Sequence, residues 1–326
     1  MIAVVGGAGY IGSHAVKHLI EKGERVVVFD NLSNGHRELL HPKAAFFQGD
    51  LASRSNLEAF FDQYEVDSVI HFAAFAYVGE SVKQPAKYYR NNMANTLNLL
   101  DAMLKHEVES IVFSSTCATY GNPVKLPIDE THPQQPINPY GRTKLMMEHM
   151  MEDYASAYGM RIAALRYFNA AGADLEGEIG EWHEPETHLI PLVLEAARGI
   201  KDELLIFGHD FDTKDGTCVR DYIHVMDLAD AHYRALIYLR ENSENLKLNL
   251  ANGEGYSNLE IIQMTERITG RKINYTLTGR REGDPAILIG SAAQAEKLLG
   301  WKPNYTLEQI IESAWNWHVK KWEEKV

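Results

Sequence analysis

The sequence predicts an α/β protein built on a doubly wound parallel sheet, with a smaller mixed α/β lobe over the carboxyl ends of the strands. The first half of the chain alternates short apolar runs with helical patterns, which is typical of parallel strands covered by helices on both faces. After about residue 170 the pattern changes to glycine-rich and acidic loops with shorter elements. We therefore expect a main domain at residues 1–170 and a lobe formed mainly by residues 171–326, some segments of which return to the main sheet.

The individual elements follow from apolar runs and from helix-start signals. Short runs rich in β-branched residues predict buried strands at residues 2–5, 25–29, 68–71, 110–113 and 162–166. Helical patterns predict helices at residues 10–22, 55–64, 85–105 and 139–158. Pro85 and Pro139 open the last two helices, where the missing proline N–H removes no helical hydrogen bond.

Composition and charge exclude several classes of protein. The formal net charge is −13 in 326 residues, which argues against a nucleic-acid or anionic-membrane surface. The two cysteines, Cys117 and Cys218, cannot form a disulfide framework and favour a reducing compartment. The first residues lack a basic segment and a cleavage site, so we expect no signal peptide, and no apolar run approaches the roughly 18 residues of a membrane span. We expect a cytoplasmic protein with no nucleic-acid or membrane partner.

A glycine motif joins the first predicted strand to the first helix. Gly6, Gly7, Gly9 and Gly12 allow a tight turn and a close approach of backbone N–H groups to a pyrophosphate. The helix N-terminus adds the positive end of its dipole. The next strand ends in Asp30, placed to bind the ribose hydroxyls of adenosine, which favours NAD over NADP. The alternative for Asp30 is a strand-end cap; we predict NAD.

A tyrosine and a lysine one helical turn apart follow the hydroxyl-rich run FSSTCATYG at residues 113–121. Tyr140 and Lys144 share one helix face, and a hydroxyl from the preceding strand end would hold a substrate oxygen beside the tyrosine. Bringing a tyrosine pKa of about 10 down to neutrality requires roughly 4 kcal/mol. A nearby ammonium and a positively charged nicotinamide both favour the phenolate. Taken alone, Tyr140 would be a packing residue and Lys144 a solvated one. The order of the glycine motif, the hydroxyl-rich strand end and the Tyr-Lys pair along the chain favours a catalytic role for both residues.

With these motifs the sequence resembles the extended short-chain dehydrogenase/reductase superfamily, and within it the UDP-glucose 4-epimerase family. The resemblance runs nearly from end to end and includes GGAGYIGSH, DNLSNG, VIHFAA, VGESVKQP, the strand-end run, NPYGRTK, LRYFNAAGA, DGTCVRDYIHVMDLADAH and RREGDPA. It implies a Rossmann-type fold with a substrate-binding lobe, a permanently bound NAD, and reversible interconversion of UDP-galactose and UDP-glucose in galactose metabolism. In this reaction hydride would leave C4 of the sugar. The 4-keto intermediate would rotate about its linkage to the diphosphate, and hydride would return to the opposite face of C4.

The resemblance also assigns residues. Tyr140 would be the base, Lys144 would lower its pKa, and Thr116, where many relatives carry serine, would bind the sugar hydroxyl. The expected cofactor-binding residues are Gly6, Gly9, Tyr10, Ile11, Gly12, Asp30, Asn31, Leu32, Ser33, Asn34, Gly35, Asp50, Leu51, Phe72, Ala73, Ala74, Ala76, Asn92, Tyr140, Lys144 and Phe168. The expected substrate-binding residues are Thr116, Tyr140, Asn169, His188, Leu189, Leu205, Phe207, Arg220, Arg281 and Asp284.

Two departures from the family bear on specificity and cofactor binding. Many relatives place a lysine where this chain has Ala76, so any charge that this lysine lends the cofactor is missing. Many relatives that exclude N-acetylated sugars carry a tyrosine at the gate of the sugar pocket, and here Leu288 lies nearest that position. Since leucine is smaller, turnover of UDP-N-acetyl sugars is an open expectation.

Three other classes of protein share features with this family. Nucleotide-sugar 4,6-dehydratases look similar but place Asp-Glu directly after the strand-end threonine, where this chain has Cys117-Ala118. A UDP-pentose or UDP-uronate 4-epimerase is not excluded, whereas a non-catalytic NAD-sensing protein would need no Tyr-Lys pair.

Two segments resemble metal-binding motifs but depart from them. The segment 183–188 resembles a zinc-protease motif, but its two histidines would not share a helix face. The segment 210–216 misses the spacing of a calcium-binding loop, so we expect no metal site.

The oligomeric state is expected to be a homodimer, because relatives pair through the helices predicted at residues 85–105 and 139–158. Both helices carry broad apolar faces. The residues of these faces are Met93, Leu97, Leu100, Leu104, Leu145, Met146 and Met150. The alternative is that these side chains pack only on the sheet.

Overall fold

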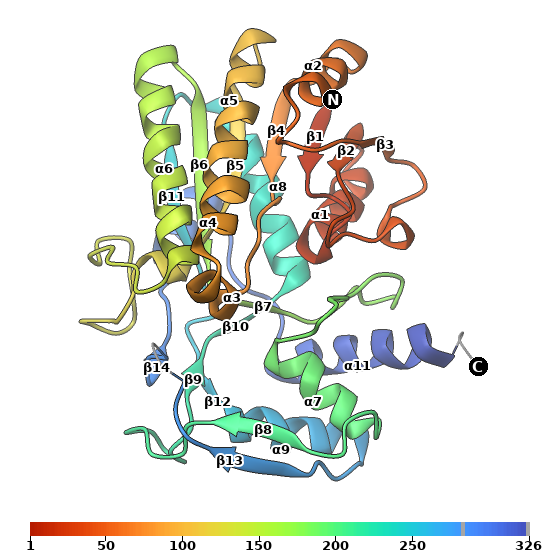
Figure 1. Cartoon of the computed structure of the whole chain (residues 1–326), viewed down its shortest axis with the longest axis vertical. Coiled ribbons are helices and arrows are strands. Elements are labelled where there is room, and N and C mark those ends of the chain that lie inside the picture. The colour runs from red at the N-terminus through yellow and green to blue at the C-terminus, as the bar shows by residue number, and fades with distance from the viewer. Residues whose placement is uncertain (282–283, 324–326) are drawn as a thin grey trace.

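A parallel sheet forms the centre of the computed structural model, which describes residues 1–281 and 284–323 (Figure 1). Seven strands among these residues pair in the order β11-β6-β5-β4-β1-β2-β3, and every neighbouring pair is parallel. Their bounds are β1 Ile2–Val5, β2 Val26–Asp30, β3 Ala45–Gln48, β4 Ser68–His71, β5 Ser110–Thr116, β6 Arg161–Tyr167 and β11 Leu246–Leu250. The order reverses between β1 and β4, where open α/β sheets bind ligands beyond the carboxyl ends. The predicted fold class is confirmed.

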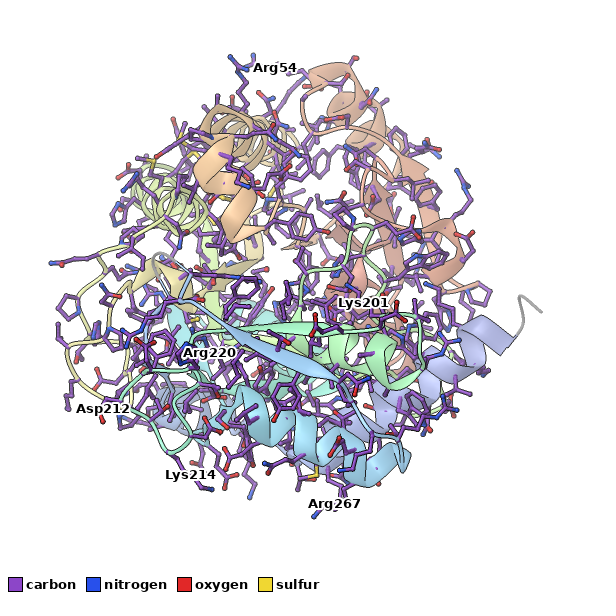
Figure 2. The ribbon with its side chains drawn as sticks, turned by 60° about the horizontal axis from the view of Figure 1, so that its bottom comes forward. Arg54, Lys201, Asp212, Lys214, Arg220 and Arg267 are labelled. Carbon is purple, nitrogen blue, oxygen red and sulfur yellow. The ribbon has the colours of Figure 1, made fainter. Side chains whose placement is uncertain are left out.

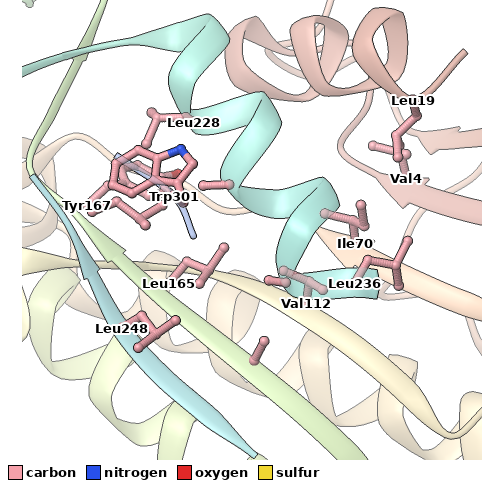
Figure 3. Packing of buried hydrophobic residues seen from close by; sticks show 14 of the residues in the cluster. Val4, Leu19, Ile70, Val112, Leu165, Tyr167, Leu228, Leu236, Leu248 and Trp301 are labelled. Atoms are coloured by element: carbon pink, nitrogen blue, oxygen red, sulfur yellow. The ribbon is translucent and has the colours of Figure 1, made fainter. Parts of the chain in front are cut away.

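Helices cover both faces of this sheet because alternate strand residues point to opposite sides. The helices are α1 Tyr10–Glu21, α2 Arg54–Gln63, α3 Val78–Lys83, α4 Pro85–Tyr88, α5 Asn95–Lys105, α6 Pro139–Tyr158 and α8 Val225–Glu241, with short 3₁₀ turns η1 Arg37–Leu39 and η3 Cys117–Thr119. Val4 packs on one face with Leu19 of α1 and Leu236 of α8 (Figure 3). Val5 packs on the other face with Phe60 of α2 and Met147 of α6.

The remaining elements form a lobe below the carboxyl ends of the strands in the view of Figure 1, and Figure 2 shows this lobe from beneath. Its strands form small sheets: β7 Asn169–Ala171 with β10 Tyr222–His224, β8 Leu204–Phe207 with β13 Tyr275–Thr278, and β9 Val219–Arg220 between β12 Tyr256–Ser257 and β14 Ile287–Leu288. Its helices are α7 Leu189–Ala197, α9 Asn258–Thr269 and α11 Leu307–Glu323. Helix α10 Ala293–Leu299 instead packs beside α8 and β11.

Several element boundaries differ from those predicted. The strand predicted at residues 110–113 continues to Thr116, because the hydroxyl residues extend the backbone ladder with β6. Their side chains are satisfied locally, since the Ser114 hydroxyl lies 2.5 Å from the Tyr167 hydroxyl and Ser115 donates to Glu148. Strands β3 and β11 were missed.

The helix predicted at residues 85–105 is also interrupted. A π-helical segment, η2 Tyr89–Ala94, separates α4 from α5. Inside it, the Asn92 side chain accepts from the Phe75 N–H at 2.9 Å and donates to the Phe75 carbonyl at 3.0 Å. A wider helical turn that presents a polar side chain to a neighbouring loop is a common use of π-helix.

No helix among the described residues is long and apolar enough to span a bilayer.

Candidate active site

A cleft of about 1050 Å³ lies between the carboxyl edge of the main sheet and the lobe. Almost all predicted site residues line it, from the glycine turn at one end to β8, β9 and β14 at the other. The exceptions are Leu32, whose N–H donates to Asp30 at 2.8 Å, and Asn92, which is fully buried against Phe75 and Thr143. Asn92 therefore supports the wall of the cleft from behind.

The glycine turn is shaped for a close backbone approach. Gly6 has a φ of +85°, and a Cβ there would lie 2.5 Å from the Ala73 nitrogen. A Cβ on Gly12 would lie 2.2 Å from the Gly6 carbonyl oxygen. Gly9 caps α1 without a side-chain hydrogen bond among the described residues, so the first N–H groups of the helix face the cleft. This cradle fits the pyrophosphate of a dinucleotide.

Asp30 caps the end of its strand and also faces the cleft. Its carboxylate accepts from the Ala8 N–H at 3.0 Å and the Leu32 N–H at 2.8 Å, so it does cap the strand end. It also lines the cleft beside the glycine turn. Burial raises the pKa of Asp30, and the two backbone N–H groups oppose this rise. A carboxylate fixed by two backbone bonds is a rigid acceptor for ribose hydroxyls.

The reacting end of the cleft lies where β5 meets the start of α6. Asn138 caps α6 by accepting from the Gly141 N–H at 2.8 Å, and Pro139 occupies the first helical position. A Cβ on Gly141 would lie 2.4 Å from the Ala118 carbonyl oxygen, so only glycine lets α6 approach the residues after β5 this closely. Tyr140 thereby lies against Thr116, whose hydroxyl interacts with the phenol.

The surroundings of Tyr140 and Lys144 disfavour the charged form of each side chain. Desolvation raises the pKa of the Tyr140 phenol, Tyr167 adds to the rise, and the Thr116 hydroxyl opposes it. Burial lowers the pKa of Lys144 to about 7, against the influence of Glu148. The Lys144 ammonium donates to the Ser114 carbonyl at 2.7 Å. The chain alone thus disfavours a phenolate, and a cation bound in the cleft would reverse that preference.

The cysteine of the hydroxyl run is not a nucleophile. Burial raises the pKa of Cys117 to about 12, so the thiolate is scarce at neutral pH. Cys117 and Ala118 form the turn η3 after Thr116, and neither is a carboxylic acid. The acid and base that a dehydratase places after its threonine are therefore missing from the end of β5.

The lobe supplies cations and apolar surface at the other end of the cleft. Arg220 donates to the Val219 and Pro285 carbonyls at 2.9 Å and lies 3.5 Å from the Asp284 carboxylate. The Arg281 guanidinium stacks 4.0 Å from the centre of the Phe207 ring. In Figure 2, Arg220 lies over the body of the molecule, whereas Lys214 and Arg267 project from its rim. This end suits a planar base with an anionic group.

A cluster of acids and histidines was not predicted at the cleft. His183 and His188 lie in a loop and share no helix face, as expected, but the loop brings both imidazoles to Glu181 and Glu186. The absence of a shared helix face did not decide whether the two histidines meet, because convergence in a loop needs no helical spacing. Burial disfavours their charge, but the carboxylates outweigh it and raise the pKa of His183 to about 9 and of His188 to about 10.

Further cleft residues were also missed by sequence reasoning. They are aromatic, histidine or acidic side chains at the cleft wall, of which Tyr222 lies on β10 and the others on loops: Tyr77, Glu181, His183 and Tyr222. His183 could have been found from the segment HEPETH at residues 183–188, which was considered only as a helical motif, and Glu181 lies two residues before it. The aromatic members carry no local signal, since tyrosine is a common residue.

The fold and this cleft define a dinucleotide-binding enzyme of the Rossmann type with a second, anion-binding compartment. The chain matches the NAD dependent epimerase/dehydratase family model over residues 2–251, and it belongs to that family. It is 53% identical to a UDP-glucose 4-epimerase from Streptococcus mutans, with 97% of this chain and 96% of that protein covered.

Solved structures give the same result. A UDP-glucose 4-epimerase from Brucella ovis, solved with NAD, superposes with a TM-score of 0.94 at 52% identity, covering 96% of this chain and 97% of that one. One from Bifidobacterium longum, solved with NAD⁺ and UDP, has a TM-score of 0.94 at 39% identity, covering 98% of both chains. The family resemblance and the choice of NAD predicted from the sequence are confirmed.

Proposed function

We propose that the protein is a UDP-hexose 4-epimerase that uses NAD to interconvert UDP-galactose and UDP-glucose. One observation carries the proposal: a single cleft has a Tyr-Lys pair with a threonine hydroxyl at one end and arginines with an apolar platform at the other. The relatives named UDP-glucose 4-epimerase, at about half identical residues over nearly the full chain, support the same reaction.

The glycine turn and Asp30 are proposed to hold the dinucleotide. The Gly6–Gly12 cradle and the open start of α1 would bind its pyrophosphate, and the Asp30 carboxylate its adenosine ribose. NAD held there would supply the acceptor for the hydride of the sugar C4 and a positive charge that favours the Tyr140 phenolate. The lysine that many relatives carry is replaced by Ala76, which lines the cleft and adds no charge.

Tyr140 is proposed as the group that removes the proton from the 4-hydroxyl and later returns one. Thr116 would bind the same oxygen, since its hydroxyl already lies against the phenol. Lys144, held by the Ser114 carbonyl, would favour the phenolate whenever its amine is protonated. A general base placed in this way typically accelerates proton transfer by about 10²–10⁴-fold.

The UDP portion is proposed to bind in the lobe. The guanidinium groups of Arg220 and of the stacked Arg281 suit diphosphate oxygens, because guanidinium groups bind such oxygens in pairs. Leu205, half exposed on β8, and Phe207 would contact the base. The other expected contacts, Asn169, His188, Leu189 and Asp284, line the same compartment.

UDP-N-acetyl sugars are proposed as second substrates on the evidence of one residue. Leu288 ends β14, pairs in register with Arg220, and lines the cleft. A leucine at this gate leaves more room for an N-acetyl group than a tyrosine would.

A homodimer and a cytoplasmic location complete the proposal. On α5 and α6, which lie side by side in Figure 1, four large hydrophobic side chains remain more than a third exposed. These are Leu97, Leu104, Met146 and Tyr158. A second copy would bury them. Both cysteines are free, which suits a reducing compartment.

The deciding experiment is to incubate the purified protein with UDP-galactose, adding no cofactor, and to identify products by NMR. UDP-glucose should form until equilibrium is reached, and the denatured protein should release NAD. A 4-keto-6-deoxy sugar as the product would assign the protein to the dehydratases instead. Turnover of a UDP-pentose or UDP-uronate alone would retain the C4 chemistry and change the substrate.

A further inference from the structure

The loop between β7 and α7 brings four potential metal ligands to one point. One donor atom each from Glu181, His183, Glu186 and His188 lies within 4.8 Å of the other three. The His183 Nδ1 atom lies 3.2 Å from a Glu181 oxygen and 3.5 Å from a Glu186 oxygen. The His188 Nδ1 atom lies 2.7 Å and 3.3 Å from the same two carboxylates. Two imidazoles and two carboxylates thus alternate around a common centre.

These separations match the edges of a small coordination tetrahedron. Zinc binds nitrogen and oxygen ligands at about 2.0–2.2 Å, which places tetrahedral ligand atoms roughly 3.3–3.5 Å apart. The two contacts of His183, at 3.2 and 3.5 Å, agree with this geometry, and His188 lies 3.3 Å from the other oxygen of Glu186. Only the contact of 2.7 Å between His188 and Glu181 would have to lengthen.

Ion pairs already link the two imidazoles to these carboxylates, and a bound ion would replace them. The Nδ1 atom of His183 is buried, and it makes no hydrogen bond within the described part of the chain. Two carboxylate oxygens nevertheless lie within 3.5 Å of it. A hydrogen bond requires the N–H to point along the line to one acceptor, whereas a metal ligand points to a centre between several ligands. The orientation of His183 is that of a ligand.

We propose that Glu181, His183, Glu186 and His188 bind one divalent cation of the zinc type. Imidazole nitrogen and carboxylate oxygen are common zinc ligands, and two carboxylates balance the charge of the ion. The other acidic group of this loop differs: Asp174, Glu176 and Glu178 already hold the Lys17 ammonium at 2.9–3.0 Å. That group has its cation, and it provides a matched control.

The ion would fasten the loop to the wall of the cleft. The His183 ring packs edge-on against Tyr10 at 6.2 Å and against Tyr77 at 6.1 Å. Tyr10 opens α1, and its hydroxyl donates to the Gly172 carbonyl at 2.6 Å. Three of the ligands are largely buried, while His188 is 47% exposed toward the cleft. The site would therefore be structural, although it shares His188 with the proposed UDP contacts.

The test is metal content, measured on the full-length protein with its bound cofactor. After treatment with a chelator, the protein is dialysed against zinc and then against metal-free buffer, and zinc is counted by elemental mass spectrometry. Wild type should retain one zinc per chain. Glu181→Gln and His183→Gln should each weaken retention at least tenfold, and Glu178→Gln should keep it.

Cobalt gives a second readout that needs no variant. Co²⁺ in the wild-type site should show the strong visible absorption of a four-coordinate ion, and excess zinc should remove it. Wild type that retains no ion, a six-coordinate cobalt spectrum, or equal retention by Glu181→Gln and Glu178→Gln would overturn the proposal. If the two cluster variants fail to fold, the wild-type cobalt spectrum and its displacement by zinc decide.

Discussion

Replacing Lys144 by methionine should make the protein more stable and much less active. The Lys144 side chain is almost fully buried, 2% exposed, and its pKa is lowered from 10.5 to about 7. A shift of 10.5 − 7, or 3.5 pKa units, corresponds to about 5 kcal/mol against folding at low and neutral pH. Methionine has a similar length and carries no charge, so this cost disappears.

One contact offsets the gain. The Lys144 ammonium donates to the Ser114 carbonyl at 2.7 Å, and an unsatisfied buried carbonyl costs about 1–3 kcal/mol. The net increase in the free energy of unfolding should be roughly 2–4 kcal/mol near pH 7, or about 3–6 °C in Tm for a chain of 326 residues. The rate should fall by at least 10², because the phenolate of Tyr140 loses its neighbouring ammonium.

The pH dependence gives the reasoning a sharper check. Between pH 7 and 10.5 the unfolded Lys144 binds a proton that the folded one has lost, so wild-type stability rises with pH in that window. Lys144→Met lacks this rise, and the difference between the two proteins should shrink toward pH 10. The measurement is urea unfolding of NAD-free wild type and variant from pH 6 to 10. A variant that is less stable at pH 7, with the same pH slope as wild type, would refute the assigned cost of burial.

Three further predictions concern the reaction and its ligands. Tyr140→Phe removes only the hydroxyl, so kcat should fall about 10²–10⁴-fold while calorimetric UDP affinity stays within twofold; a near-normal rate would remove Tyr140 from its role. Asp30→Asn should weaken NAD binding about 10–150-fold, measured as NAD retained after gel filtration, because hydrogen bonds to a charged acceptor contribute about 1.5–3 kcal/mol. Leu288→Tyr should lower turnover of UDP-N-acetylgalactosamine relative to UDP-galactose at least tenfold, and an unchanged ratio would show that this residue is not the gate.

Features coded by neighbouring residues could be predicted from the sequence. The glycine turn, the helix that follows it and Asp30 lie within 25 residues, and their β-α-β pattern is a local property. Tyr140 and Lys144 are four residues apart on a helix that Asn138 and Pro139 start, so their common face follows from helical geometry. Both features are found in the structure where the sequence placed them.

Only the tertiary structure decided features that depend on distant partners. Strand β5 extends through polar residues because β6 pairs with it, and β11 joins the main sheet although it lies far from the other strands in sequence. Asn92 is withdrawn from the cleft by its bonds to Phe75 across a widened helical turn. His183 and His188 come together with two carboxylates in a loop whose residues follow neither a helical nor a strand periodicity. Side-chain periodicity records which face of an element a residue occupies, but the path of a loop is set by what it packs against.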